Sequence, residues 1–302
     1  MYDHQAKKLN EQGTFKEIVV EISARQLSAK SETLRQMSMF LTQAVFMEVC
    51  VHPKPGLVTR HGSGAHTDMS ILTFAAGSAV LAKAFSDLQI LGMKHNGNYQ
   101  ELFGKVRRYG VSAEQELLRV TKGVNTQRGI LFAGGLLAAA AGAALNKGLD
   151  SEALCSIVAE MTQGLTENEL SGLQADRPLT AGERLYQAYG ITGIRGEVEA
   201  GFPSVRQNGL PGLKEAFAKG AGLNDALVHA LVHLMTVVQD SNVIWRGGYA
   251  KLPFVQQRAR DILAQGSIFT DSGRRLLAES EEPVSYTHLT VPICCLLRLR
   301  YI

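Results

Sequence analysis

Residues 52–68 hold the densest group of chemically active side chains in the sequence. The segment contains three histidines, two basic side chains and one carboxylate, interrupted by two prolines and three glycines. Prolines restrict the backbone, and glycines permit turns and the close approach of a ligand, so this mixture is typical of a shaped loop and not of a packed core. Its ionisable groups suit anion binding and proton transfer, and the candidates are Lys54, Arg60, His66 and Asp68.

A second candidate is a glycine-bounded segment at residues 123–129, which runs into an Ala- and Gly-rich apolar stretch. Asn125 or Thr126 is expected to cap the helix that begins there. The backbone N–H groups of that helix N-terminus, with Arg128 beside them, would form an anion site. The alternative is an ordinary cap before a buried helix, and the pattern alone favours neither.

A third candidate is the charged segment 180–203, which is rich in glycine. It presents Arg195 and Glu197 on a turn-rich loop, and Arg184 lies on the helix predicted before that loop. Arginine suits bidentate contacts to phosphate. The alternative is a solvated helix end. Two glutamates of the segment are expected to be surface charges of that kind, Glu183 and Glu199.

The fourth candidate covers residues 240–248. Asp240 follows an apolar pattern that predicts a helix over residues 223–239, and Arg246 precedes two glycines. A carboxylate at the C-terminus of a helix opposes the helix dipole, which indicates a cation or another partner nearby. The alternative is a simple helix stop at the two glycines.

Two histidines lie four residues apart within the same predicted helix, His229 and His233. This spacing suits a metal-binding pair. No glutamate follows in an HExxH arrangement, and both histidines lie among alanine, leucine and valine. The surroundings therefore favour histidines of a core or an interface over metal ligands.

The spacing of apolar residues is mostly helical along the chain, and strand patterns are scarce. It predicts an all-α fold, a single multi-helix globular domain whose charged glycine-rich loops converge on one site. We expect a polar N-terminal arm over 1–32, the helical domain over 33–282 and a separate tail over 283–302. The expected helices cover residues 33–50, 69–92, 98–121, 128–147, 151–165, 181–190, 210–220, 223–239, 255–265 and 271–280. The loops expected between them include 52–68, 122–129, 190–203 and 240–248.

Charge and composition exclude several classes of protein. The 302 residues carry a net charge of only +3, so no basic stripe for nucleic acid is indicated. Residues 1–30 lack the apolar core of a signal peptide, and residues 129–145 are expected to fall short of a membrane span. The cysteines show no CxxC or metal spacing, which favours a reducing compartment. We expect a cytoplasmic protein with no membrane or nucleic-acid partner.

The composition changes abruptly after Glu282. Residues 284–290 read like the translation of a sequencing adapter, so we hypothesise that residues 283–302 are not native and that the native C-terminus is missing. An intact reading frame in an independent clone would contradict this. Cys294 and Cys295 lie in this tail, so we expect no functional role for them.

The usual nucleotide signatures GxxxxGK[ST] and GxGxxG are absent. The cations, carboxylates and glycines of the four segments fit a ligand with two or three phosphates and a divalent cation. The segments also resemble the triphosphoribosyl-dephospho-CoA synthase family over about residues 33–265. The motifs that carry the resemblance, in the family's order, are HPKPGLV from His52, GAHTDM from Gly64, GVNT from Gly123, TAGER…YG…GxRGE from Thr180 and DSN…RGG from Asp240.

The chain departs from the family pattern at three positions. Gln127 follows GVNT where the family usually has histidine, and an amide cannot transfer a proton. Thr59 and Ser241 stand where aspartate and threonine are frequent in the family. Any acid–base role of the position after GVNT is therefore not available to this chain.

The resemblance implies a reaction of ATP with 3′-dephospho-CoA that gives 2′-(5″-triphosphoribosyl)-3′-dephospho-CoA and adenine. That product is the prosthetic-group precursor for the acyl carrier subunit of citrate lyase or malonate decarboxylase, and a separate transferase normally attaches it. Attack occurs at the ribose C1 and not at phosphorus, so no Walker lysine is needed. A carboxylate would stabilise the oxocarbenium character of the transition state.

The resemblance also implies roles for the candidate residues. Asp68 and Asp240 are expected to bind Mg²⁺ or to act as the general base, with Glu48 and Glu197 as further catalytic candidates. His66 is expected to orient Asp68 or to assist the departure of adenine. The expected phosphate- and substrate-binding residues are Lys54, Arg60, Asn125, Thr126, Arg128, Arg184, Arg195 and Arg246.

Two alternatives use the same residues. A Mg²⁺-dependent nucleotide N-glycosyl hydrolase would use water as the acceptor and would release adenine without dephospho-CoA. A non-catalytic helical module that binds a coenzyme or a carrier protein would bind its ligand without releasing adenine.

Overall fold

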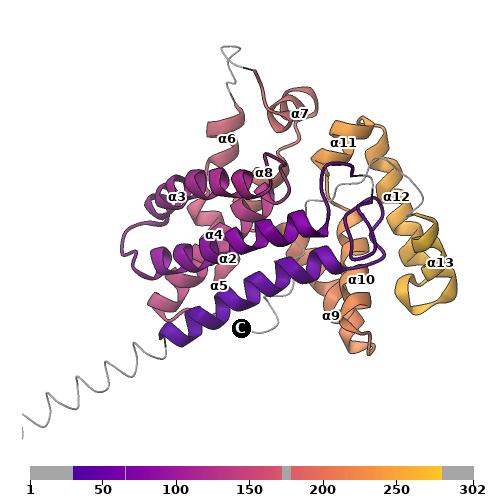
Figure 1. Ribbon diagram of the computed structural model, residues 1–302, viewed down its shortest axis with the longest axis horizontal. Helices are drawn as coiled ribbons and strands as arrows, with labels where there is room; N and C mark the ends of the chain where they lie inside the picture. The colour runs from indigo at the N-terminus through magenta and orange to yellow at the C-terminus, as the bar shows by residue number, and fades with distance from the viewer. Residues whose placement is uncertain (1–29, 65, 172–177, 281–302) are drawn as a thin grey trace, which may run out of the picture.

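The computed structural model describes residues 30–64, 66–171 and 178–280, and this part of the chain is all-α (Figure 1). The only extended pairing within it is an isolated bridge between Thr59 and Gly62. A first helix covers residues 30–50. The helices that follow are α2 (Ile71–Met93), α3 (Tyr99–Val120), α4 (Arg128–Lys147), α5 (Ala153–Met161), α6 (Leu165–Leu170), α7 (Ala181–Tyr189), α8 (Gly193–Glu199), the π-helix η1 (Val205–Gly209), α9 (Leu210–Ala218), α10 (Leu223–Met235), α11 (Ser241–Gly247), α12 (Lys251–Ala264), the 3-10 helix η2 (Ser267–Phe269) and α13 (Asp271–Glu279).

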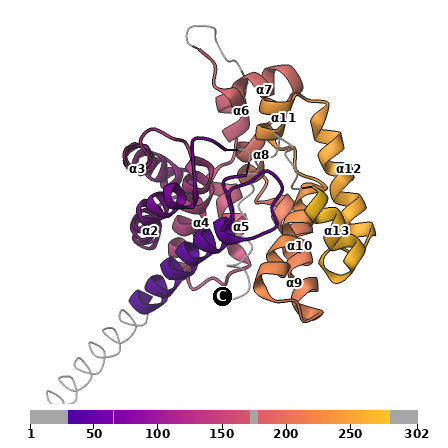
Figure 2. The ribbon, with the colours of Figure 1, turned by 45° about the vertical axis from the view of Figure 1, so that its right-hand side comes forward.

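The predicted fold class is confirmed, since one continuous core links most of these helices. Helices α2–α5 form one side of the molecule and α9, α10, α12 and α13 the other, with α7 and α11 in contact at one edge (Figures 1 and 2). The first helix begins by residue 30, before the boundary predicted at 33. The rest of the predicted arm, residues 1–29, and the predicted tail, residues 283–302, lie outside the described residues.

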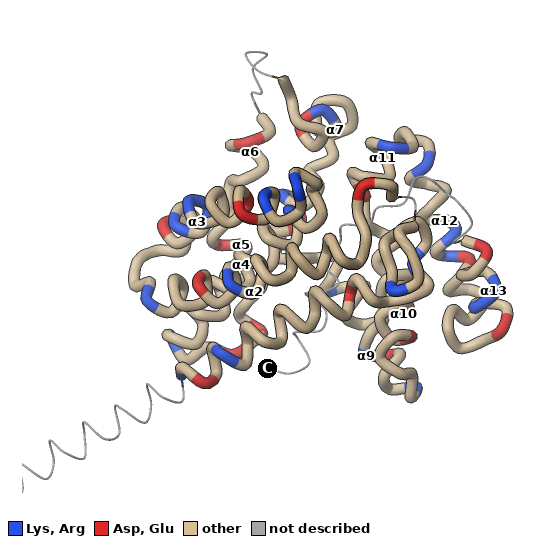
Figure 3. Tube along the Cα trace, viewed as in Figure 1, with Lys and Arg blue, Asp and Glu red and all other residues tan. Residues whose placement is uncertain are grey.

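Helix α4 lies at the centre of its half and packs against α2, α3 and α5. Its small residues are buried, and they let the α2 and α4 backbones approach closely. A Cβ on Gly142 would lie 1.9 Å from the Gln89 carbonyl oxygen, and one on Gly92 would lie 1.9 Å from that of Ala139. Apart from its two ends, α4 carries no charged residue (Figure 3).

Helices α2 and α4 are each long and apolar enough, by length and composition, to cross a membrane. The expectation that residues 129–145 fall short of a span was therefore wrong on those criteria. In α4, however, 78% of the apolar window is buried inside the protein, as in a core helix.

Replacing Gly142 with alanine should destabilise the fold by about 3 kcal/mol, because the added methyl group meets backbone atoms that have no room to move. Gly110 of α3 is the matched control, since a Cβ there meets nothing within 4 Å. Gly110→Ala should stabilise the protein by about 1 kcal/mol through helix propensity. Urea unfolding of both variants measures the difference, and equal stabilities would contradict the close packing.

Several predicted element boundaries were wrong. Residues 190–203 and 240–248, expected to be loops, contain α8 and α11, because buried side chains such as Val198 and Val243 anchor these short helices in the core. The expected helix 151–165 is shorter, since α5 ends at Met161, and a separate helix α6 begins after Gly164, whose φ is +78°. Helix α12 begins at Lys251, four residues earlier than expected, because Pro253 in its first turn is compatible with a helix.

The end of α10 has the largest consequence for the site. The helix ends at Met235, with Thr236 as its C-cap, and not at residue 239. Asp240 therefore lies at the N-terminus of α11, with extended backbone angles. The expectation of a carboxylate that opposes a helix dipole was wrong, because an acidic N-cap is favourable.

Candidate functional site

A cavity of about 1010 Å³ lies where the four charged segments of the sequence meet. Its walls come from the 52–68 loop, α3, the start of α4, α6–α8, η1 and residues 237–246. The structure brings to this cavity most of the predicted residues, namely Glu48, Lys54, His66, Asn125, Thr126, Arg128, Arg195, Glu197, Asp240 and Arg246. Three predicted residues do not line it, Arg60, Asp68 and Arg184.

Glu48 and Lys54 form a buried ion pair at the cavity wall. The Lys54 Nζ lies 2.8 Å from the Glu48 carboxylate and also donates to the Glu48 carbonyl oxygen at 2.7 Å. The Lys54 side chain is only 2% exposed. Because a buried charge is costly without its partner, loss of either residue would leave the other in an unfavourable environment.

His66 lines the cavity with Asp68 behind it. The His66 Nδ1 lies 3.3 Å from the Asp68 carboxylate, whose side chain is 52% exposed. Burial lowers the pKa of His66, and the charge of Arg246 lowers it further, whereas Asp68 opposes both effects. His66 is therefore mainly neutral at pH 7. A proton on Nδ1 that is directed at the Asp68 carboxylate would leave Nε2 as the proton-accepting nitrogen.

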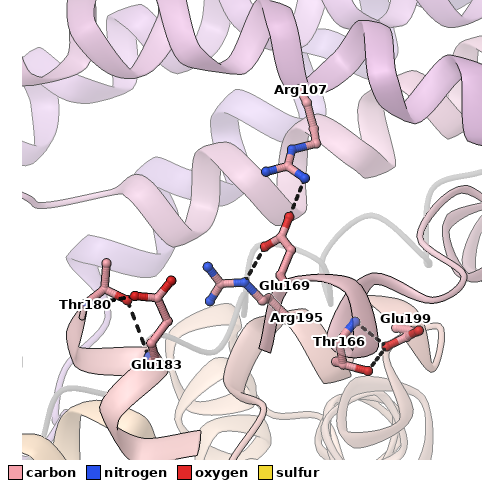
Figure 4. Close-up of polar contacts among 7 residues, drawn as sticks. All are labelled: Arg107, Thr166, Glu169, Thr180, Glu183, Arg195 and Glu199. Atoms are coloured by element: carbon pink, nitrogen blue, oxygen red, sulfur yellow. Dashed lines mark hydrogen bonds and ion pairs between the residues drawn. The ribbon is translucent and has the colours of Figure 1, made fainter. Parts of the chain in front are cut away.

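At another part of the cavity wall, Glu169 joins two arginines (Figure 4). Its carboxylate pairs with Arg107 from α3 and accepts a hydrogen bond from the Arg195 Nε at 2.7 Å. All three residues line the cavity. Because two guanidinium groups share one carboxylate, Arg107, Glu169 and Arg195 together keep a net positive charge. Such a held pair of arginines suits phosphate binding.

Arg128 pairs with a further residue of this wall, Glu114, at 2.7 Å. Sequence reasoning missed Arg107, Glu114 and Glu169. Their helical spacing looks like that of an ordinary solvated face, and only the packing of α3 and α6 around the cavity distinguishes them.

Two glutamates expected at the solvated surface are instead structural. Glu183 is 4% exposed and forms a capping box with Thr180, whose backbone N–H donates to the Glu183 carboxylate at 2.7 Å (Figure 4). Glu199 accepts hydrogen bonds from the backbone N–H and the hydroxyl of Thr166. These contacts fix the ends of α7 and α6 beside the cavity.

Two predicted carboxylates of the cavity are held by backbone donors. The Asp240 carboxylate caps α11, accepting from the N–H of Asn242 at 2.7 Å and of Val243 at 3.2 Å, and the residue is 6% exposed. Glu197 accepts from the backbone N–H of Ser204 at 3.0 Å and from its hydroxyl. Both carboxylates are thus oriented before any ligand binds.

The position after GVNT faces away from the cavity. Gln127 is fully buried, does not line the cavity, and donates to the Ser78 hydroxyl of α2 at 3.1 Å. It also occupies the N-cap position of α4 without a side-chain cap, so the expected caps Asn125 and Thr126 were wrong. An amide at this position therefore has a packing role, and its inability to transfer a proton does not affect the cavity.

Two predicted phosphate-binding arginines have structural contacts. Arg60 donates to the Cys50 carbonyl at 3.0 Å and to the Asn224 side chain at 2.8 Å, which ties the 52–68 loop to the start of α10. Arg184 donates to the Leu179 carbonyl at 3.2 Å and lies over the Trp245 ring. Neither reaches the cavity wall.

The family of ATP:dephospho-CoA triphosphoribosyl transferases matches residues 34–286, which include every cavity-lining residue. The chain belongs to this family. Like the other members of this transferase family it is an enzyme, and the family's description gives ATP and dephospho-CoA as the substrates. The resemblance inferred from the motifs of the four segments is confirmed.

The names of similar curated bacterial proteins are consistent with this triphosphoribosyl transferase family. A probable 2-(5″-triphosphoribosyl)-3′-dephosphocoenzyme-A synthase of Malonomonas rubra is 40% identical over 242 residues, which cover 79% of this chain and 77% of the relative. The 2-(5″-triphosphoribosyl)-3′-dephosphocoenzyme-A synthase of Klebsiella pneumoniae is 36% identical over 270 residues, 88% of this chain and 89% of the relative. That of Pectobacterium atrosepticum is 39% identical over 235 residues, 77% of each. No solved structure gives a significant match.

Proposed function

We propose that the enzyme transfers the 5-triphosphoribosyl group of ATP to the 2′-hydroxyl of 3′-dephospho-CoA and releases adenine. The observation that carries the proposal is the cavity where all four motif segments meet. Its volume of about 1010 Å³ lies at the upper end of the range for small-molecule sites, which suits two substrates bound together.

In this proposal the triphosphate lies against the arginines of the cavity. Arg107 and Arg195, held by Glu169, and Arg128 and Arg246 on neighbouring walls supply charge-assisted donors. ATP would enter as its Mg²⁺ complex. Carboxylate oxygens such as those of Asp240 and Glu48 are the hard ligands that Mg²⁺ prefers, so the cavity fits the ion, which would offset phosphate charge.

His66 is the general base of the proposed reaction, and Asp68 orients it. The neutral imidazole accepts the proton of the attacking 2′-hydroxyl, and the Asp68 carboxylate stabilises the imidazolium that forms. This reverses the roles expected from the sequence, because His66 and not Asp68 lines the cavity. Glu197, held by Ser204, is the carboxylate proposed to stabilise the oxocarbenium-like transition state.

Replacing Asp68 with asparagine should move the acid limb of the pH profile of kcat/KM to lower pH. Burial lowers the pKa of His66 and Asp68 raises it, so loss of the carboxylate lets His66 remain neutral in more acidic solution. Initial rates of wild type and variant across the acid range measure the shift. An unchanged limb, or one moved to higher pH, would contradict the role of His66 as the base.

The product is the proposed prosthetic-group precursor for the acyl carrier subunit of citrate lyase or malonate decarboxylase, which a separate transferase would attach. Because the substrates are cytoplasmic metabolites, we place the enzyme in the cytoplasm.

Mass spectrometry of the coenzyme product tests the proposed chemistry. With Mg²⁺-ATP and 3′-dephospho-CoA, the coenzyme should gain one triphosphoribosyl group. An analogue that lacks the 2′-hydroxyl should gain none, because the attacking oxygen is missing. Modification of that analogue would show that another atom is the acceptor, and no modification of either would contradict the transfer.

A further inference from the structure

A second group of ionisable side chains lies outside the cavity, between α9, α10 and η2. It consists of Glu215 from α9 and of His229 and His233 from α10, and none of the three lines the cavity. Figure 1 shows α9 at the end of the molecule away from α7 and α11, with α10 running from beside α9 toward α11. The proposed reaction makes no use of this cluster.

We propose that Glu215, His229 and His233 form a binding site for a divalent transition-metal ion of the zinc class. The two Nε2 atoms lie 3.1 Å apart, and the Glu215 Oε2 lies 3.6 Å from that of His229 and 3.9 Å from that of His233. Ligand atoms in a tetrahedral zinc site lie about 3.4 Å apart, given bonds of about 2.0–2.1 Å. The three atoms therefore need to move only by tenths of an ångström to share one ion.

The groups around the cluster orient it for a metal. The His229 Nδ1 lies 2.9 Å from the Ser267 hydroxyl, a contact that leaves Nε2 as the ligating nitrogen. Gly212 makes room for the His233 ring, since a Cβ there would lie 2.6 Å from its Cδ2. Lys219 occupies the other oxygen of Glu215, Oε1, at 2.6 Å.

The protonation states also suit a metal ligand set. Burial lowers the pKa of both histidines, and the hydrogen bond from Lys219 lowers the pKa of Glu215. The set at neutral pH is thus two neutral imidazoles and one carboxylate. Imidazole ligands favour zinc and its neighbours, whereas Mg²⁺ prefers oxygen ligands alone, so this site is distinct in chemistry from that of Mg²⁺-ATP.

A metal at this cluster would link two helices, α9 and α10, whose neighbouring segments in the chain line the cavity. Helix α9 follows η1, which supplies Gln207 and Asn208 to the cavity wall, and α10 precedes residues 237–240, which also line it. Glu215 lies on α9 and both histidines lie on α10, so an ion bound by all three would hold the two helices together. The fourth tetrahedral position would be left for water.

The test is zinc binding by the intact, metal-stripped protein in competition with a chromophoric chelator. We expect wild type to bind one Zn²⁺ per chain and millimolar Mg²⁺ to leave that binding unchanged. Glu215→Gln and His233→Gln should each lower the affinity by about 100-fold or more, since even partners behind the ligands change it by about 10–100-fold. His61→Gln, which removes an exposed histidine of the 52–68 loop, is the matched control and should bind like wild type.

Thermal unfolding gives a second readout. Zinc should raise the Tm of wild type and His61→Gln but not that of the two cluster variants. If a cluster variant does not fold, the visible absorption of Co²⁺-loaded wild type decides, because tetrahedral Co²⁺ absorbs strongly and six-coordinate Co²⁺ weakly. No stoichiometric zinc binding by wild type, or unchanged affinity in both cluster variants, would overturn the proposal.

Discussion

Replacing His66 with asparagine should lower kcat by about 10²–10⁴-fold, the usual contribution of a general base. The variant keeps a polar side chain of similar length but no group that accepts a proton near neutral pH. His66 lies at the cavity wall with Asp68 at 3.3 Å, and burial keeps its imidazole neutral by lowering its pKa. The effect should fall on kcat, because substrate binding rests on the arginines of the other walls.

Steady-state kinetics of this variant need a control from the same loop. His61 lies five residues earlier and is exposed outside the cavity. His61→Gln should retain nearly wild-type kcat, and the unfolding midpoints of both variants should stay close to that of wild type. Near-wild-type turnover of His66→Asn would remove this residue from the chemistry.

Replacing Arg195 with methionine should lower kcat/KM for ATP by about 10–100-fold, because a hydrogen bond from a charged donor contributes about 1.5–3 kcal/mol. Arg195 lines the cavity and is held by Glu169, which also pairs with Arg107. The loss should be seen mainly as a higher KM for ATP, because the triphosphate is retained through the reaction and is bound in both the ground state and the transition state.

Arg184 provides the matched control for this charge. It lies on the neighbouring helix α7 outside the cavity, where it contacts the Leu179 carbonyl and the Trp245 ring. Arg184→Met should change kcat/KM by less than Arg195→Met does, with a similar small change in stability. Equal losses of kcat/KM in the two variants would mean that ATP binding depends on the overall positive charge of the protein and not on Arg195 held by Glu169.

The sequence predicted the fold class and the convergence of its charged loops for clear physical reasons. Apolar residues at helical spacing determine which faces are buried, and the small residues of α4 allow its close contact with α2. Glycine-rich segments were harder to interpret. Residues 193–199 form α8 although glycine disfavours helices, because packing of Val198 in the core outweighs local propensity.

The sequence pattern also could not place the single residues of the candidate site. Motif spacing located the segments, but not which side chain of each faces the cavity. Two ionisable residues of one segment, such as His66 and Asp68 or Arg184 and Arg195, can differ in whether the folded chain places them at the cavity wall. Glu169 was missed because its partners Arg107 and Arg195 come from distant parts of the sequence.

Release of adenine from Mg²⁺-ATP, followed with and without 3′-dephospho-CoA, tests the central claim most directly. The proposed transfer predicts release that depends on dephospho-CoA and equals the amount of triphosphoribosylated product. Release without dephospho-CoA would indicate a hydrolase with water as acceptor. No release by the folded protein would contradict the transfer and leave a binding role for the cavity.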